Sequence, residues 1–158
     1  MTENAARPRI PDANQLVPEI QNVARELVQA TVNGSVPATT TTLMFLRAGQ
    51  IVGNTYQAIR HTMALREAGE SEQRIAAVAT WWDAPYFTEA ERAALALTEA
   101  VFGPNPRGEE RVSDELFARA AQHYDEKALA TLMVTLASAG FWMVVALVLK
   151  PPAFEQEG

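Results

Sequence analysis

The sequence of 158 residues contains no cysteine. This absence excludes disulfide bonds, thiol-based peroxide reduction, cysteine proteolysis and metal sites with thiolate ligands. Basic residues are also few, because 13 lysines and arginines stand against 19 acidic residues and give a formal net charge of −6. Without a basic run, the protein is not expected to bind nucleic acid or an anionic membrane surface. A small-molecule substrate and protein partners remain as the expected ligands.

The sequence also lacks an N-terminal apolar segment of the signal-peptide type, because residues 1–11 are polar and contain two prolines. We therefore expect an extended arm there and a cytoplasmic protein. One uncharged run, at 128–149, is long enough for a membrane span. Small or hydroxyl-bearing residues interrupt this run. We interpret it as a helix buried in a bundle or at a subunit interface, so no membrane partner is expected.

No stretch alternates between apolar and polar residues as a β-strand does, and apolar residues instead recur at helical spacing. Thr88 with Glu91 three residues later forms a capping box, which marks one helix start. The sequence predicts an all-α protein with a single helical domain. The expected helices cover 12–32, the stretch from the threonine run at 39–42 to 53, 54–69, 71–80, 88–103, about 114–124, and 126–149. The expected divisions are an arm at 1–11, the domain at 12–152 and a C-terminal tail at 153–158.

The sequence holds no familiar nucleotide-binding or hydrolase motif. Its two histidines lie far apart without carboxylates at metal-binding spacing, so neither a metal nor another cofactor is expected. If Gly53 ends one helix and Asn54 begins the next, then Asn54, Gln57 and His61 share one helix face. Each residue also has a simpler explanation: Asn54 as a helix cap, Gln57 as a solvated side chain and His61 as a structural histidine.

A longer pattern surrounds this stretch. It reads Leu46-Arg47-x-x-Gln50-x-x-Gly53-Asn54-x-Tyr56-Gln57-x-x-x-His61-x-x-x-Leu65-x-x-x-Gly69, and further blocks follow at 87–95, 123–126 and 141–152. Together they resemble the alkylhydroperoxidase D-like and carboxymuconolactone decarboxylase superfamily. The resemblance implies an all-helical bundle that associates into homotrimers or homohexamers.

The chain departs from the redox members of that superfamily at their reactive residues. Those members use two cysteines, a histidine and a glutamate as a proton relay. By position, the cysteines correspond to Asn54 and Gln57, the glutamate to Thr42, and the histidine to His61. Neither an amide nor a hydroxyl can form a sulfenic acid or a disulfide, so the protein is not expected to be a thiol peroxidase.

The resemblance favours a cofactor-independent acid–base enzyme of the decarboxylase type, which acts on a small, largely apolar organic acid, lactone or ring compound. His61 would shuttle a proton, because the ordinary pKa of imidazole lies near neutrality. Asn54, Gln57 and Thr42 would bind the substrate. Two alternatives remain open: a non-catalytic binding or assembly protein on the same scaffold, or an engineered cysteine-free derivative with a rebuilt pocket.

Overall fold

The computed structural model describes residues 8–151, and every regular element within that range is a helix. The all-α class predicted from the sequence is confirmed. Residues 1–7 of the expected arm and the expected tail at 153–158 lie outside the described residues. The elements are α1 (Ala13–Leu16), α2 (Glu19–Thr31), α3 (Ala38–Val52), α4 (Thr55–Glu67), α5 (Glu72–Ala77), the 3-10 helix η1 (Val78–Thr80), α6 (Glu89–Phe102), α7 (Asp114–Ala121) and α8 (Glu126–Leu149).

The single helix expected over 12–32 is wrong, because the chain forms two helices there. α1 ends at Leu16 and α2 begins at Glu19, with Pro18 at the N-cap of α2. Proline lacks a backbone N–H and restricts the residue before it to extended conformations, here Val17. The break therefore follows from one residue whose effect outweighs the continuous apolar spacing. The capping box of Thr88 at the start of α6 is as predicted. The helix expected over 71–80 is α5 followed by the 3-10 helix η1, and α7 ends at Ala121, before the expected position near 124.

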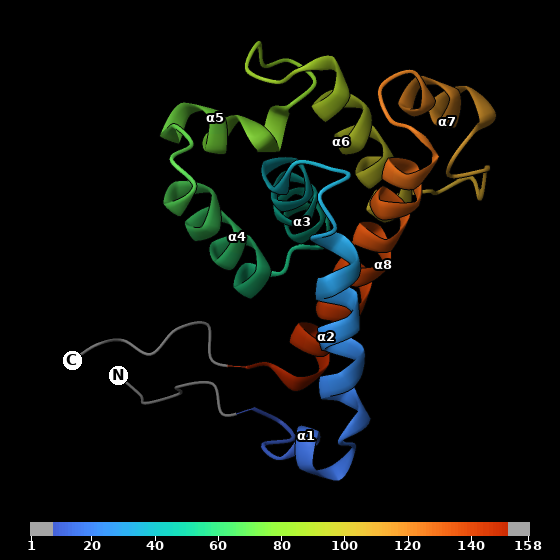
Figure 1. The fold of residues 1–158 in the computed structure, drawn as a ribbon. Helices are drawn as coiled ribbons and strands as arrows, with labels where there is room; N and C mark the ends of the chain where they lie inside the picture. Colours follow the sequence, from blue (N-terminus) through green and yellow to red (C-terminus); the bar gives the residue numbers. More distant parts are fainter. Residues whose placement is uncertain (1–7, 152–158) are drawn as a thin grey trace.

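The central helix of the fold is α3, which Figure 1 shows between α4, α6 and α8. Three apolar clusters share its side chains. Leu43 and Leu46 pack with α4, α5 and α6, and Met44 packs with α6, α7 and α8. Ala48 packs with the C-terminal half of α8. Because most of α3 is buried, its side chains are held in place by neighbouring helices. Ala38, Thr41, Thr42 and Phe45, in its N-terminal half, border the candidate site described below.

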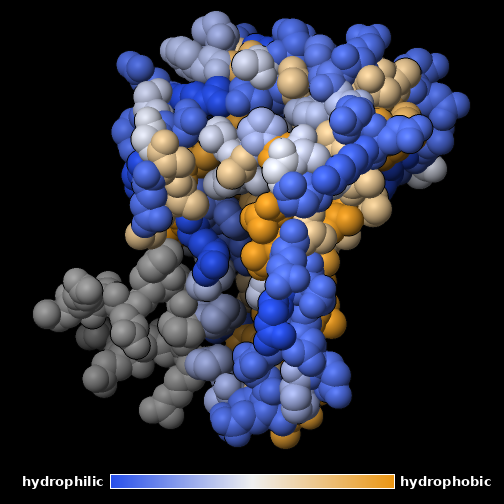
Figure 2. Space-filling view, in the orientation of Figure 1, coloured by the Kyte–Doolittle hydropathy of each residue, from blue (hydrophilic) through white to orange (hydrophobic). Residues whose placement is uncertain are grey.

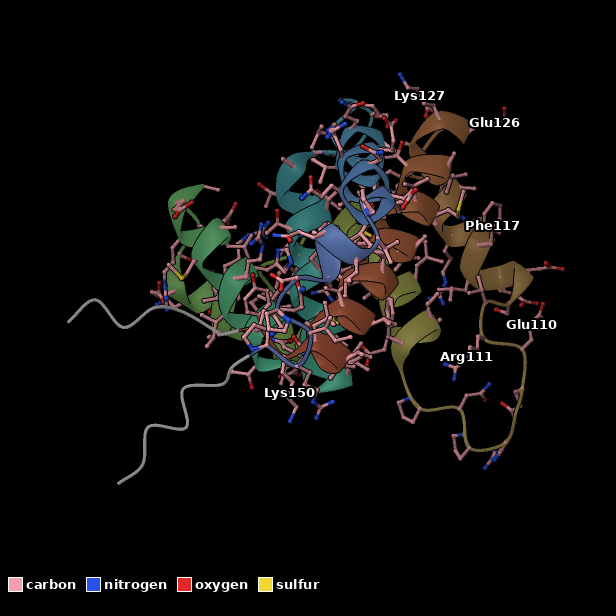
Figure 3. All side chains as sticks on the ribbon, turned by 90° about the horizontal axis from the view of Figure 1, so that it is seen from below. Glu110, Arg111, Phe117, Glu126, Lys127 and Lys150 are labelled. Atoms are coloured by element: carbon pink, nitrogen blue, oxygen red, sulfur yellow. The ribbon has the colours of Figure 1, made fainter. Side chains whose placement is uncertain are left out.

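The long apolar helix α8 carries charges only near its ends, where Figure 3 labels Glu126 and Lys127 at one end and Lys150 just past the other. Its length and composition would suffice for a membrane span, a property that core helices of soluble proteins share. One face of α8 is buried in the fold. Other apolar side chains remain exposed, namely Met133, Val144, Leu147 and Val148.

Helix α2 and the C-terminal half of α8 lie side by side and extend away from the body formed by α3 to α7 (Figure 1). The outward face of α2 is hydrophilic, whereas apolar residues gather where α8 runs behind it (Figure 2). The segment that precedes α1 contacts the end of α8, where the Arg9 backbone N–H donates to the Leu149 carbonyl at 2.8 Å. The candidate site lies where α2, α3, α4 and α8 meet.

Candidate functional site

The turn between α3 and α4 brings the first turn of α4 against α3. Gly53 has φ of 76°, a left-handed conformation that favours glycine, and it ends α3. A Cβ atom on Gly49 would lie 3.1 Å from the Ala58 nitrogen and 3.2 Å from the Gln57 Cβ. Glycine at this position therefore permits the close approach that fixes Gln57 beside α3.

Asn54 is the N-cap of α4. Its side-chain oxygen accepts the backbone N–H of Gln57 at 2.9 Å, and the residue is buried. Asn54 is not among the residues that line the cavity described below. Asn54 therefore contacts the predicted site residue Gln57 only through the Gln57 backbone N–H, and it positions the start of α4 without lining the cavity.

Gln57 connects α4 to α8 and also contacts His61. Its side-chain nitrogen donates to the Trp142 carbonyl at 3.4 Å, and its oxygen lies 3.0 Å from His61 Nε2. Because the carbonyl of Trp142 can only accept a hydrogen bond, the Gln57 oxygen is turned toward the histidine. That oxygen also only accepts, so His61 carries its proton on Nε2. In the neutral ring Nδ1 is then the basic nitrogen.

The ring of His61 stacks on Phe45 of α3, with centroids 4.8 Å apart and an interplanar angle of 11°. Burial lowers the pKa of His61 from 6.5 to about 4, and the neighbouring positive charge of Arg60 adds to this shift. The pKa near neutrality expected from the sequence is therefore not retained in the folded protein. At pH 7 the imidazole is neutral and can take a proton at Nδ1.

A cavity of about 320 Å³ opens beside these residues, between α2, α3, α4 and α8. It contains Thr42, Gln57 and His61, three of the four site residues predicted from the sequence. The walls combine apolar and aromatic groups with a few hydroxyl groups, the Gln57 amide and the charged Arg60, a mixture typical of sites for small organic molecules. The lining residues are Val28, Thr31, Val32, Ala38, Thr41, Thr42, Phe45, Tyr56, Gln57, Arg60, His61, Ser138 and Trp142.

Sequence reasoning missed several residues of this cavity. Ser138 and Trp142 come from α8, and neither was proposed as a site residue. Thr131, Thr135 and Ser138 follow one another at intervals of four and three residues, which puts three hydroxyl groups on one face of an apolar helix. That spacing was the available signal for Ser138. Nothing local to Trp142 indicated that its backbone carbonyl would orient Gln57.

Arg47 lies outside the cavity lining and connects α3 to α6. Its guanidinium forms a bidentate pair with Glu99 of α6 at 2.7 and 2.8 Å, and Trp81 donates to the same carboxylate at 3.3 Å. The hydrogen bonds from Arg47 lower the pKa of Glu99, so the pair stays ionised. Within residues 8–151, no three histidine, aspartate or glutamate side chains gather in a manner suited to a metal ion.

These features define a class of protein: an all-helical bundle with a small, partly open cavity that holds one partly buried imidazole. Residues 18–100 match the sequence model of the carboxymuconolactone decarboxylase family. The uncharacterized protein YdfG of Bacillus subtilis (strain 168) is 30% identical over 129 residues, which cover 81% of this chain and 85% of YdfG. The chain belongs to the carboxymuconolactone decarboxylase family.

Solved structures share the fold. A protein of unknown function from Agrobacterium tumefaciens, ATU0492, provisionally assigned as the antioxidant defence protein AhpD, superposes with a TM-score of 0.79 at 24% identity. The match covers 91% of this chain and 96% of that one. A point variant of the debrominase Bmp8, in complex with 2,3,4-tribromopyrrole, gives a TM-score of 0.77 at 17% identity and covers 89% of this chain and 74% of its own. At these identities the likeness concerns the fold, which is the alkylhydroperoxidase D-like bundle.

Proposed function

We propose that the protein is a cofactor-independent acid–base enzyme that acts on a small, largely apolar organic acid, lactone or ring compound. The observation that carries this proposal is the neutral His61, whose Nε2–H is directed to Gln57 and whose Nδ1 is left as a base beside a cavity of about 320 Å³. Family membership supports it, since the family takes its name from a lactone decarboxylase. A debrominase of the same fold binds a brominated pyrrole, a small ring of comparable type.

The chemistry proposed for His61 is a proton transfer at a carbon next to a carbonyl group. Nδ1 takes a proton from that carbon, the electron pair moves onto the carbonyl oxygen as an enolate, and the imidazolium returns the proton to a second carbon. In a decarboxylation, the bond to the carboxylate breaks instead. Carbon dioxide then leaves, and the enolate carbon receives a proton from water through His61. The remaining hydroxide combines with the carbon dioxide as bicarbonate. Gln57 stabilises the charged ring in both cases, because its oxygen accepts the Nε2–H.

Turnover assays with a matched pair of histidine variants test this proposal. Carboxymuconolactone, related lactones and β-keto acids are incubated with the wild-type protein, and product is followed by mass spectrometry. His61→Ala is expected to lower kcat by about 10²- to 10⁴-fold, the usual contribution of a positioned acid–base group. His123→Ala removes the second, exposed histidine and is expected to leave kcat unchanged. Equal turnover by wild type and His61→Ala would contradict the proposal.

A second function, ligand binding without turnover, is favoured by one observation. A general base works best when its pKa lies near the operating pH, and the pKa of His61 lies at about 4. A thermal-shift screen of the same compounds, followed by recovery of the bound molecule, separates the two functions. Recovery of unchanged compound from every stabilised complex supports a binding protein, and recovery of product supports the enzyme.

We also propose that the protein forms a homotrimer or homohexamer through the exposed apolar side chains of α8 and α2. Val144, Leu147 and Val148 follow one another at helical spacing on α8, so they share one face, and Val144 is 61% exposed. Apolar residues gathered in this way on a surface mark interaction sites more often than isolated ones do. Light scattering after size exclusion tests the proposal, because a monomer has a mass of 17.3 kDa.

A further inference from the structure

Ser138 differs from the other hydroxyl-bearing residues of α8. The Thr131 hydroxyl donates to the Lys127 carbonyl at 2.9 Å, and the Thr135 hydroxyl donates to the Thr131 carbonyl at 2.8 Å. Ser138 is 1% exposed, and its Oγ is the one buried side-chain nitrogen or oxygen atom of residues 8–151 that has no hydrogen-bond partner. Its hydroxyl therefore lacks the contact to its own helix that the two threonines make.

An unpaired buried hydroxyl is unfavourable, at about 1–3 kcal/mol, so its retention requires a reason. Ser138 lines the same cavity as His61 and Gln57. A hydroxyl group at a cavity wall can obtain its missing hydrogen bond from a molecule that enters the cavity. The unpaired Oγ and the cavity are independent observations, and both indicate a ligand at this position.

The threonine hydroxyl groups of the cavity show which kind of ligand atom Ser138 would meet. Thr31 donates to the Val28 carbonyl, and Thr41 and Thr42 both donate to the Ala38 carbonyl, each at 2.9 Å. Each of these threonine oxygens therefore faces a ligand only as an acceptor. The proton of the Ser138 hydroxyl is not engaged in this way, so Ser138 can donate to a ligand oxygen.

We propose that Ser138 Oγ donates a hydrogen bond to the carbonyl or carboxylate oxygen of a small ring compound bound in this cavity. Ser138 then selects oxygen-bearing rings over hydrocarbons of the same shape. It also stabilises the enolate oxygen that forms if His61 removes a neighbouring proton. The inference rests on the cavity assigned above as the binding site, and it does not require turnover.

The experiment compares two probes that have nearly the same shape. Acetophenone carries a carbonyl oxygen where α-methylstyrene carries a CH₂ group. Their dissociation constants are measured by NMR titration of the full-length protein. In Ser138→Ala we expect the affinity for acetophenone to fall about three- to tenfold, the effect of one neutral hydrogen bond. The affinity for α-methylstyrene is expected not to fall.

Thr135→Val is the matched control, because it removes a buried hydroxyl of α8 that bonds within the helix and lies outside the cavity lining. It is expected to leave the acetophenone to α-methylstyrene ratio unchanged. Thermal unfolding of the free proteins provides a second readout. Ser138→Ala is expected not to lower Tm, since no hydrogen bond is lost, whereas Thr135→Val is expected to lower it.

Three results would overturn the inference. One is an affinity ratio in Ser138→Ala equal to that of the wild type, and another is no binding of acetophenone by the wild type up to its solubility limit. The third is a crystal structure of the acetophenone complex in which Ser138 Oγ bonds a trapped water instead of the probe. A changed ratio together with full turnover by His61→Ala would leave this inference standing and remove only the proposed function.

Discussion

Acidification should destabilise the protein through His61. In the unfolded chain this histidine has its ordinary pKa of 6.5, whereas burial lowers the pKa in the folded protein to about 4. As the pH falls below 6.5, His61 becomes protonated in the unfolded state but stays neutral in the folded state until the pH approaches 4. The unfolded state then binds more protons, so folding stability is lost as the pH falls from about 6.5 to about 4.

The size of this loss follows from the two pKa values. One pKa unit corresponds to about 1.4 kcal/mol, so the drop from 6.5 to about 4 sets an upper limit of about 3 kcal/mol. Most of that appears early in the titration. Linkage places the loss between pH 7 and pH 5 at about 2 kcal/mol. For a domain of this size, that is a large fraction of the total free energy of unfolding.

Urea unfolding at pH 7 and pH 5 measures the effect, with wild type and His61→Gln compared at one protein concentration. Glutamine keeps a polar group near Gln57 but does not titrate, so carboxylate effects common to both proteins cancel in the difference. We expect the wild type to lose about 2 kcal/mol more than the variant. Equal losses, or a ring NMR titration of His61 with a midpoint near 6.5, would refute the assignment of a partly buried, neutral imidazole.

Three further changes have defined outcomes. Asn54→Ala removes the oxygen that caps α4 and is expected to lower the free energy of urea unfolding by about 1 kcal/mol, so an unchanged value would remove its capping role. Arg47→Met leaves the carboxylate of Glu99 without its bidentate partner, and we expect unfolding to become easier by about 2 kcal/mol, with partial recovery in Arg47→Lys. Val144→Glu places a charge on the exposed face of α8 and is expected to shift the mass found by light scattering toward 17.3 kDa; an unchanged oligomer would exclude this face from the interface.

The parts of the fold that depend on neighbouring residues were predictable from the sequence. The capping box at Thr88 forms as expected, and Asp125 caps α8 by accepting the Ala128 N–H at 2.8 Å. Gly53 ends α3 in the left-handed conformation. These features arise within a few residues, so spacing and residue type suffice to find them. The break at Pro18 is also a local effect, although the apolar spacing predicted one continuous helix there.

The candidate site was only partly predictable because it joins residues that are far apart in the chain. Spacing along α4 placed Gln57 and His61 on one face. Helix capping was the simpler explanation of Asn54, and the structure shows that cap. The spacing along α4 could not show that Ser138, on the last helix of the fold, lines the cavity. The pKa of His61 depends on burial by other helices, which no local pattern records.

The basicity of His61 depends on whether the cavity holds an anionic group. In the empty site, burial and Arg60 both disfavour a positive charge on the ring. A carboxylate or a developing enolate within about 4–6 Å would favour that charge and raise the pKa by about 1–3 units. His61 would then be a stronger base only while an anionic group occupies the cavity. A weak base in the free protein is therefore compatible with proton transfer in the complex, and a rise in the His61 pKa on binding benzoate, absent with α-methylstyrene, would be its signature.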